Sequence, residues 1–149
     1  MIVFADTSAL FALLVRDDYM HVRAKANFEY FVEHNTPLLT SSYVLIETLT
    51  LLQRRVSLEA MWDFERRIMP ILDVIWADER WHTQAMQRLH AERSRSVSLT
   101  DCLSFEIMEA QDIATAFTFD NHFTERGFEM AAFHDLDAGR NPGENPAGS

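Results

Sequence analysis

Short apolar runs alternate with segments of helical periodicity along most of this 149-residue chain. Buried strands are expected at residues 1–5, 38–40, 71–76, 113–119 and 128–133, where apolar, β-branched and aromatic residues gather. Helices are expected at residues 9–15, 20–34, 42–55, 58–69, 79–93 and 99–111. Because strands that alternate with helices are joined by crossover connections, the pattern predicts an α/β fold with a mostly parallel central sheet flanked by helices.

The length is that of one ordinary domain. We expect residues 1–136 to form that domain. Residues 137–149 carry three of the four glycines and two of the four prolines, which favours a flexible C-terminal tail. The single cysteine excludes a disulfide framework. Since no apolar stretch reaches the roughly 18 residues of a membrane span, we expect a cytoplasmic protein that has no contact with a membrane.

The formal net charge is −10, which disfavours nonspecific affinity for a polyanion. The charge is unevenly placed, because residues 54–95 hold eight of the thirteen basic residues and only seven of the twenty-three acidic ones. Seven of the eight arginines of this stretch are candidates for a path that holds a phosphate backbone, or for ordinary solvated helix faces. They are Arg54, Arg55, Arg66, Arg67, Arg88, Arg93 and Arg95.

Two aspartates, Asp6 and Asp120, directly follow apolar runs that are predicted to be strands. Ligands of open parallel sheets bind at the carboxyl ends of the strands, so neighbouring strands would bring both carboxylates into one crevice. An aspartate at such a position also caps helices and begins turns. Thr7 or Ser8 is expected to cap the first helix.

Two further acids are candidates for the same crevice. Glu47 lies in a helix whose other residues are mostly apolar, and it is either exposed or a carboxylate at the edge of the core. Asp101 follows Ser98 by three residues, which is also the spacing of a capping box. No single one of these four acids indicates a function. A functional interpretation depends on their arrangement together.

Four short motifs occur in a defined order: Asp6-Thr7-Ser8 after the first strand, Glu47 in the third helix, Ser98-Leu99-Thr100-Asp101 at a helix start, and Thr118-Phe119-Asp120-Asn121-His122-Phe123 after a late strand. In order, spacing and total length, the chain resembles the PIN-domain ribonucleases, and particularly the VapC-type toxins of toxin–antitoxin pairs. The resemblance covers residues 1–133 and implies a PIN-like three-layer fold. It also implies metal-dependent endonucleolytic cleavage of RNA.

By position, the resemblance implies that Asp6, Glu47, Asp101 and Asp120 form the catalytic, metal-binding site, and that Ser8 and Thr118 support these acids. Carboxylates in one crevice repel each other, and Mg²⁺ or Mn²⁺, which prefer oxygen ligands, would relieve that repulsion. The resemblance further implies an RNA substrate, an inhibitory antitoxin and a homodimer. One or two ions are both compatible with the sequence.

Other site chemistries fit less well. The six histidines form no zinc motif and are expected to be solvated or structural, and Cys102 is expected to be a core residue. The scarcity of glycine before residue 127 excludes phosphate-cradling glycine loops. Two alternative functions stay open: a PIN-like binding or assembly module with little catalysis, and a PIN nuclease of RNA maturation outside any toxin–antitoxin pair.

Overall fold

The computed structural model describes residues 1–132, so the predicted tail at 137–149 and the last residues of the predicted domain lie outside the described part. The strands are β1 (Val3–Ala5), β2 (Leu38–Ser41), β3 (Leu72–Ile75), β4 (Thr115–Phe117) and β5 (Glu129–Met130). The helices are α1 (Thr7–Leu14), α2 (His21–Glu33), α3 (Ser42–Arg55), α4 (Leu58–Arg67), α5 (Glu79–Glu92), α6 (Leu99–Ala110) and α7 (Asn121–Glu125), with the short 3₁₀ helix η1 (Met69–Ile71) before β3.

The five strands form one sheet in the order β3-β2-β1-β4-β5, and all four pairings are parallel. β1 therefore lies in the middle, with β2 on one side and β4 on the other. In the register of β1 with β4, Ala5 pairs with Phe117. Since both strands run the same way, the residues that follow them emerge side by side at one edge of the sheet. The predicted α/β class with a parallel sheet is confirmed.

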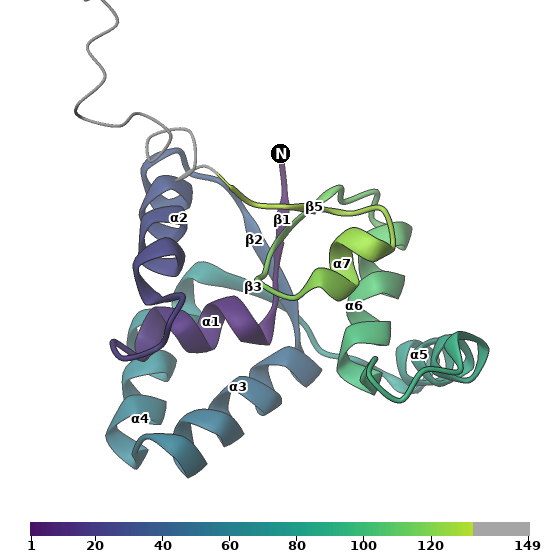
Figure 1. The fold of residues 1–149 in the computed structure, drawn as a ribbon, viewed down its shortest axis with the longest axis horizontal. Coiled ribbons are helices and arrows are strands. Elements are labelled where there is room, and N and C mark those ends of the chain that lie inside the picture. The colour runs from purple at the N-terminus through teal and green to yellow at the C-terminus, as the bar shows by residue number, and fades with distance from the viewer. Residues whose placement is uncertain (133–149) are drawn as a thin grey trace, which may run out of the picture.

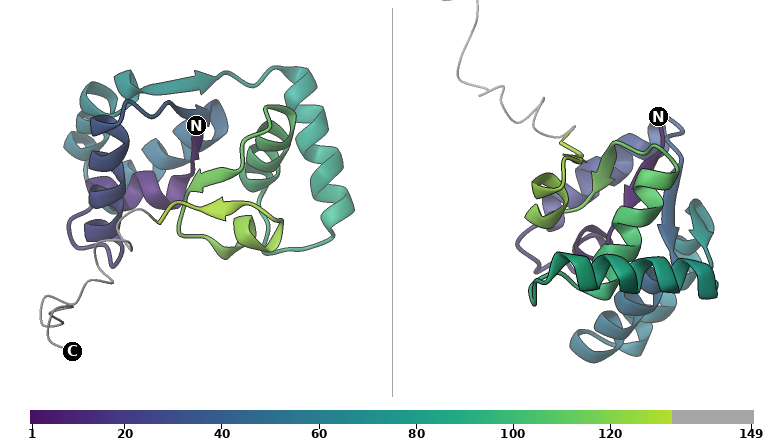
Figure 2. Two further views of the ribbon diagram at one scale, coloured as in Figure 1. Left: turned by 90° about the horizontal axis from the view of Figure 1, so that it is seen from above. Right: turned by 90° about the vertical axis from the view of Figure 1, so that its right-hand side faces the viewer.

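Helices cover both faces of the sheet. α1 and α2 lie on one face and α5 and α6 on the other, which gives three layers (Figures 1 and 2). α3 lies near the ends of β1 and β2 that carry their carboxyl termini (Figure 1). The sheet and both helix layers share one core, rich in Phe and Leu, whose largest fully buried side chains include Phe4, Phe105 and Phe117. Within residues 1–132, no helix is both long enough and apolar enough to cross a bilayer.

Four helices begin at a serine or aspartate whose side chain caps the first turn. The side chains of Ser41, Ser57, Asp78 and Ser98 each accept a hydrogen bond from the backbone N–H three residues later. The first helix differs, because Asp6, and not Thr7 or Ser8, occupies the cap position of α1. An aspartate that the sequence singled out as a candidate ligand thus also begins a helix.

Two other local features differ from the expected pattern. The short helix α7 was not anticipated; it starts at Asn121 because the side chain of Asp120 caps it. In α3, the sequence periodicity predicts a core stripe at residues 45, 49, 52 and 56; Leu45 and Leu52 are buried, but Val56 is 46% exposed just after the helix ends. The buried side also includes Val44 and Thr48, since α3 packs against both α1 and β2.

Candidate active site

All four acids singled out in the sequence line one cavity of about 440 Å³ at the carboxyl ends of β1 and β4. We call it the carboxylate cavity. Its acidic lining residues are Asp6, Asp18, Glu47, Asp101 and Asp120, and its only basic lining residue is Arg55. Thr7, Ser8, Phe11, Met20, Leu51, Ser98 and Phe119 complete the lining. The topology thus converges acids that lie up to 114 positions apart in the sequence.

Asp6 lies at the centre of a hydrogen-bonded network on the floor of the cavity. Its Oδ2 accepts hydrogen bonds from the hydroxyls of Ser8 and Thr118, each at 2.8 Å. Those hydroxyls in turn accept from the backbone N–H groups of Phe119 and Asp120, each at 3.0 Å. Both hydroxyl hydrogens are directed at one oxygen of Asp6, and no residue of the described chain forms a hydrogen bond with the other oxygen, Oδ1. The network therefore fixes the carboxylate and leaves one oxygen available.

The environment of Asp6 is unfavourable for its negative charge. The residue is only 3% exposed, and burial raises the pKa of its carboxyl from 3.8 to about 6, with a further increase from the charge of Asp101. The hydrogen bonds from Ser8 and Thr118 lower the pKa and only partly offset the cost of burial. A buried carboxylate without a cationic partner is the kind of group that a bound cation would stabilise.

Asp101 has a structural role as well as a place in the cavity. It belongs to a capping box at the start of α6, in which its Oδ2 accepts from the Ser98 N–H at 3.2 Å and the Ser98 hydroxyl accepts from the Asp101 N–H at 3.0 Å. Burial, and to a smaller extent the charge of Asp120, raises its pKa. The capping interpretation and the ligand interpretation of Asp101 are therefore compatible.

Glu47 enters the cavity from α3 and is half-buried, which excludes the interpretation of a fully solvated side chain. Burial raises the pKa of its carboxyl, and the charge of Asp6 adds to the increase, while a hydrogen bond from the Thr100 side chain opposes both. The charge of Asp6 thus raises the pKa of Glu47, the charge of Asp101 raises that of Asp6, and the charge of Asp120 raises that of Asp101. The four acids form one electrostatic unit.

His122 is the site residue that sequence reasoning missed. Its Nδ1 lies 3.1 Å from Asp120 Oδ1 and 3.6 Å from Asp101 Oδ2. One ligand atom from each of these three residues lies within 4.8 Å of the others, the closest such set in residues 1–132. The Asp120 side chain accepts a hydrogen bond from the His122 N–H at 2.9 Å. This bond stabilises the turn that places the His122 imidazole next to the carboxylates of Asp101 and Asp120. The sequence signal that could have indicated His122 is its position two residues after Asp120, which directly follows a predicted strand.

The donor set of the cavity fits a divalent metal ion. Nδ1 of His122 is buried and has no hydrogen-bond partner within the described chain, although two carboxylate oxygens lie near it. Carboxylate oxygens are the preferred ligands of Mg²⁺ and Mn²⁺. Asp6 and Glu47 line the same cavity but lie outside the tight set of Asp101, Asp120 and His122. The arrangement is thus a partly open acidic pocket.

Comparisons with known proteins agree with this architecture. The family model of the PIN domain matches residues 3–129. Over 127 residues, the chain is 32% identical to the 23S rRNA-specific endonuclease VapC20 of Mycobacterium tuberculosis, found in two strains, and the match covers 85% of this chain and 95% of VapC20. This chain is a PIN-domain protein of the VapC type. The family resemblance drawn from the four motifs is confirmed.

Solved structures place this PIN domain among similar folds. The crystal structure of M. tuberculosis VapC20, described as a sarcin–ricin loop cleaving toxin, superposes with a TM-score of 0.74 at 31% identity, over 85% of this chain and 95% of the other. PAE2754 of Pyrobaculum aerophilum superposes with a TM-score of 0.63 at 15% identity, over 95% of this chain and 97% of the other. At that identity PAE2754 supports the fold alone.

The only cysteine of this PIN domain takes no part in the site chemistry. Cys102 follows Asp101 in the chain but is fully buried in the core. Burial raises the pKa of its thiol to about 11, so the nucleophilic thiolate form is suppressed near neutral pH. The expectation that Cys102 is a core residue is confirmed.

Proposed function

We propose that this PIN domain is a metal-dependent endoribonuclease that hydrolyses phosphodiester bonds of RNA. The observation that carries the proposal is the convergence of Asp6, Glu47, Asp101 and Asp120 on one cavity, supported by the similarity to an endonuclease of the VapC type. A cluster of acids at the carboxyl ends of parallel strands repels a phosphate by itself, and it becomes a phosphate-cleaving site when it holds a cation.

The proposed division of work follows the geometry. Asp6, Glu47, Asp101 and Asp120 would hold Mg²⁺ or Mn²⁺, and the bound ion would supply the positive charge that phosphate oxygens and an attacking water require. Asp6 would offer Oδ1, since Ser8 and Thr118 engage its Oδ2. The raised pKa of Asp6 makes protons compete with the cation for its carboxylate below about pH 6.

The substrate and partners are also part of the proposal. VapC20 acts on 23S rRNA, and we propose a structured ribosomal RNA loop as the substrate class of this chain as well. Such a substrate would place the reaction in the cytoplasm. We further propose that an antitoxin inhibits the enzyme. An arginine of that antitoxin would compete with the metal for the carboxylates. Finally, we propose a homodimer as the active assembly.

The experiment is a cleavage assay on a synthetic 23S rRNA stem-loop that contains the sarcin–ricin sequence, with Mg²⁺, with Mn²⁺ and with EDTA. Asp6→Asn is the test variant and Asp63→Asn, an exposed carboxylate on α4, is the matched control. We expect cleavage that requires the metal, is retained in the control and is lost in Asp6→Asn. Equal cleavage in all samples would indicate contamination and overturn the proposal. Metal-dependent protection from unfolding without any cleavage would favour a binding module.

A further inference from the structure

The seven arginines of residues 54–95 that were candidates for an RNA path separate into two groups in the structure. Arg66 and Arg67 lie 3.9 and 3.2 Å from the Asp63 carboxylate on the same helix. Arg88 forms ion pairs with three glutamates, the closest of which is Glu109 at 2.9 Å. Because these charges are neutralised locally, these three arginines are ordinary partners of acidic side chains.

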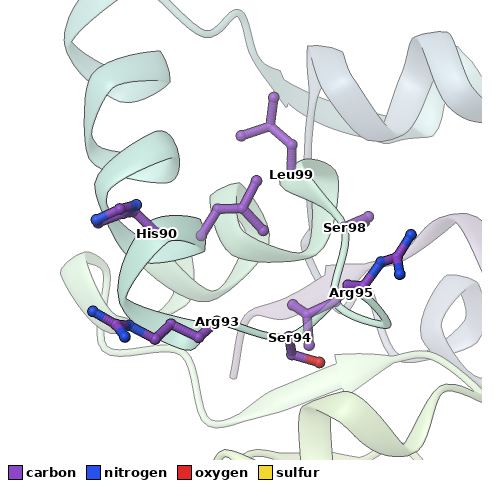
Figure 3. Close-up of a pocket in the computed structure, with 8 residues that line it drawn as sticks. His90, Arg93, Ser94, Arg95, Ser98 and Leu99 are labelled. Atoms are coloured by element: carbon purple, nitrogen blue, oxygen red, sulfur yellow. The ribbon is translucent and has the colours of Figure 1, made fainter.

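The other four arginines have no ion pair or hydrogen bond within residues 1–132. They are Arg54, Arg55, Arg93 and Arg95. Arg55 lines the carboxylate cavity. Arg93 and Arg95 line a separate groove of about 870 Å³, in the connection between α5 and α6 (Figure 3). In a chain with a net charge of −10, two unpaired arginines that line one groove, Arg93 and Arg95, point to an anionic ligand.

The groove is lined by basic, hydroxyl and apolar side chains. We call it the α5–α6 groove, and its lining residues are Leu89, His90, Arg93, Ser94, Arg95, Val97, Ser98 and Leu99. None of them is acidic. Glu92, which precedes Arg93 in the chain, is engaged by Arg126 at 2.8 Å and by Arg88 at 3.5 Å. Asp101, whose carboxylate accepts from the Ser98 N–H, lines the carboxylate cavity and not the groove. The arginines and serines therefore present N–H and O–H donors to solvent.

The backbone of the connection spreads the two arginines apart. Arg93 ends α5 in the left-handed conformation, with φ of 51°, and the hydroxyls of Ser94 and Ser96 lie 2.8 Å apart. Figure 3 shows His90 and Arg93 pointing to one side of the connection and Arg95 to the other, the side on which Ser98 lies. The two positive charges thus lie on opposite sides of the connection.

The groove adjoins the carboxylate cavity, because Ser98 lines both. The same residue holds Asp101 through the capping box, with its hydroxyl 3.0 Å from the Asp101 N–H. A strand whose scissile phosphate lies in the cavity would therefore pass directly into the groove. Arginine is well suited to phosphate contacts, because its planar fork donates two parallel hydrogen bonds.

We propose that the α5–α6 groove holds the RNA backbone next to the scissile phosphate, with Arg93 and Arg95 as phosphate-binding residues. The proposal rests on the proposed function and adds the place where the substrate binds. It also explains how a protein with a net charge of −10 binds RNA, since the local charge of the groove, and not the net charge, meets the phosphates.

The test variant is the full chain with Arg93→Asn and Arg95→Gln. Asparagine tolerates the positive φ at position 93, so the turn is preserved. The matched control is Arg66→Gln with Arg67→Gln, which removes the same charge from arginines already paired with Asp63. Cleavage of the 23S rRNA stem-loop gives kcat and KM. Binding of the same RNA to the Asp6→Asn chain, at several salt concentrations, gives the dissociation constant without cleavage.

We expect the test variant to raise KM and the dissociation constant about 10-fold near 0.1 M salt, with kcat changed less than threefold. The slope of log affinity against log salt should fall by about 1.4 for two phosphate contacts to a single strand. Arg95→Lys, which keeps the charge, should recover most of the binding. A KM and a salt slope equal to those of the control would overturn the proposal.

The two proposals can fail separately. Absence of metal-dependent cleavage in the unmodified chain would overturn the proposed function, and the binding measurements on the Asp6→Asn chain would still decide whether the groove holds RNA. A lower kcat in the test variant with unchanged RNA binding would also overturn the proposal that the groove binds RNA, because it would indicate a disturbed Asp101 capping box.

Discussion

Charges are unbalanced in the carboxylate cavity but balanced in a second cluster, which we call the ion cluster. It consists of Arg88, Glu92, Glu106, Glu109 and Arg126. In the ion cluster, Glu92 accepts from Arg126 at 3.0 and 2.8 Å and lies 3.5 Å from Arg88. The guanidinium groups of both arginines lie over the Phe105 ring, about 5 Å from its centre. In the cavity, burial and then the charge of a neighbouring acid raise the pKa of Asp6, Glu47 and Asp101, and the single arginine of the lining forms no ion pair in the described chain.

This difference distinguishes buried charges that stabilise the fold from buried charges that belong to the candidate active site. Arg126 and Arg88 lower the pKa of Glu92, so this carboxylate is more stable in its charged form inside the protein than in water. Burial and like charge raise the pKa of Asp6 to about 6, so its charged form is less stable in the protein. Balanced charges stabilise the fold, whereas the unbalanced ones are those that we propose to bind a cation.

The sharpest test of this contrast is Asp101→Asn. We expect cleavage to fall by about 1,000-fold, because the proposed metal site loses one negative charge, while the melting temperature of the metal-free protein stays equal or rises as repulsion is relieved. The amide oxygen of asparagine can still accept the Ser98 N–H of the capping box. A cleavage assay and thermal melts in EDTA give the two results. A melting temperature that falls by more than about 5 °C, which is roughly 1 kcal/mol or more, would show that Asp101 is chiefly structural.

The opposite result is expected for Glu92→Ala. Arg88 and Arg126, whose side chains are only 15% and 14% exposed, would lose a shared partner. Breaking a largely buried pair from one side costs about 3 kcal/mol, which urea unfolding would measure. Cleavage per folded molecule should change less than twofold. Glu65→Ala on α4, a glutamate without an ion pair in residues 1–132, is the control. An unfolding free energy of Glu92→Ala equal to that of the unmodified chain would contradict the view that the ion cluster stabilises the fold.

The pH dependence of stability should differ in sign between the regions. Asp6 takes up its proton near pH 6 when folded and near 3.8 when unfolded. The folded state binds more protons between these values, so the unfolding free energy of the metal-free protein should fall by about 3 kcal/mol as pH rises through this window. Glu92, with its lowered pKa, contributes stability that is present above its ordinary value of 4.5 and is lost as pH falls further.

The contribution of Asp6 can be isolated by comparing the unmodified chain with Asp6→Asn in urea at pH 4, 5, 6 and 7, in EDTA. The difference in unfolding free energy between the two proteins should change across pH 4–6 and level off above it. Adding Mg²⁺ at pH 7 should stabilise the unmodified chain only. A difference that stays constant with pH would mean that the Asp6 carboxyl keeps an ordinary pKa.

Much of the fold could be predicted because strand and helix patterns are local. The apolar run before Asp6 and the run before Asp120 are β1 and β4, and their predicted parallel pairing follows from crossover connections. That pairing places both aspartates at one edge. The helix of Glu47 was recognisable from its periodicity, although its buried side was assigned wrongly at Val56.

The parts that could not be predicted depend on contacts between distant segments. Asp18 and Arg55 line the cavity only because the connection after α1 and the end of α3 meet there. His122 joins Asp101 through the turn at Asp120, and the sequence does not show how far α6 lies from that turn. The distinction between paired and unpaired arginines likewise depends on which acids lie within reach.

The hydrogen bond between Thr118 and Asp6 spans 112 positions of the chain. Asp6 follows β1, whereas Thr118 follows β4. A nascent polypeptide cannot form this contact until β4 has left the ribosomal tunnel and joined β1. For an enzyme proposed to cut the RNA of ribosomes, activity would thus be withheld from the ribosome that is making it until β4 has been released.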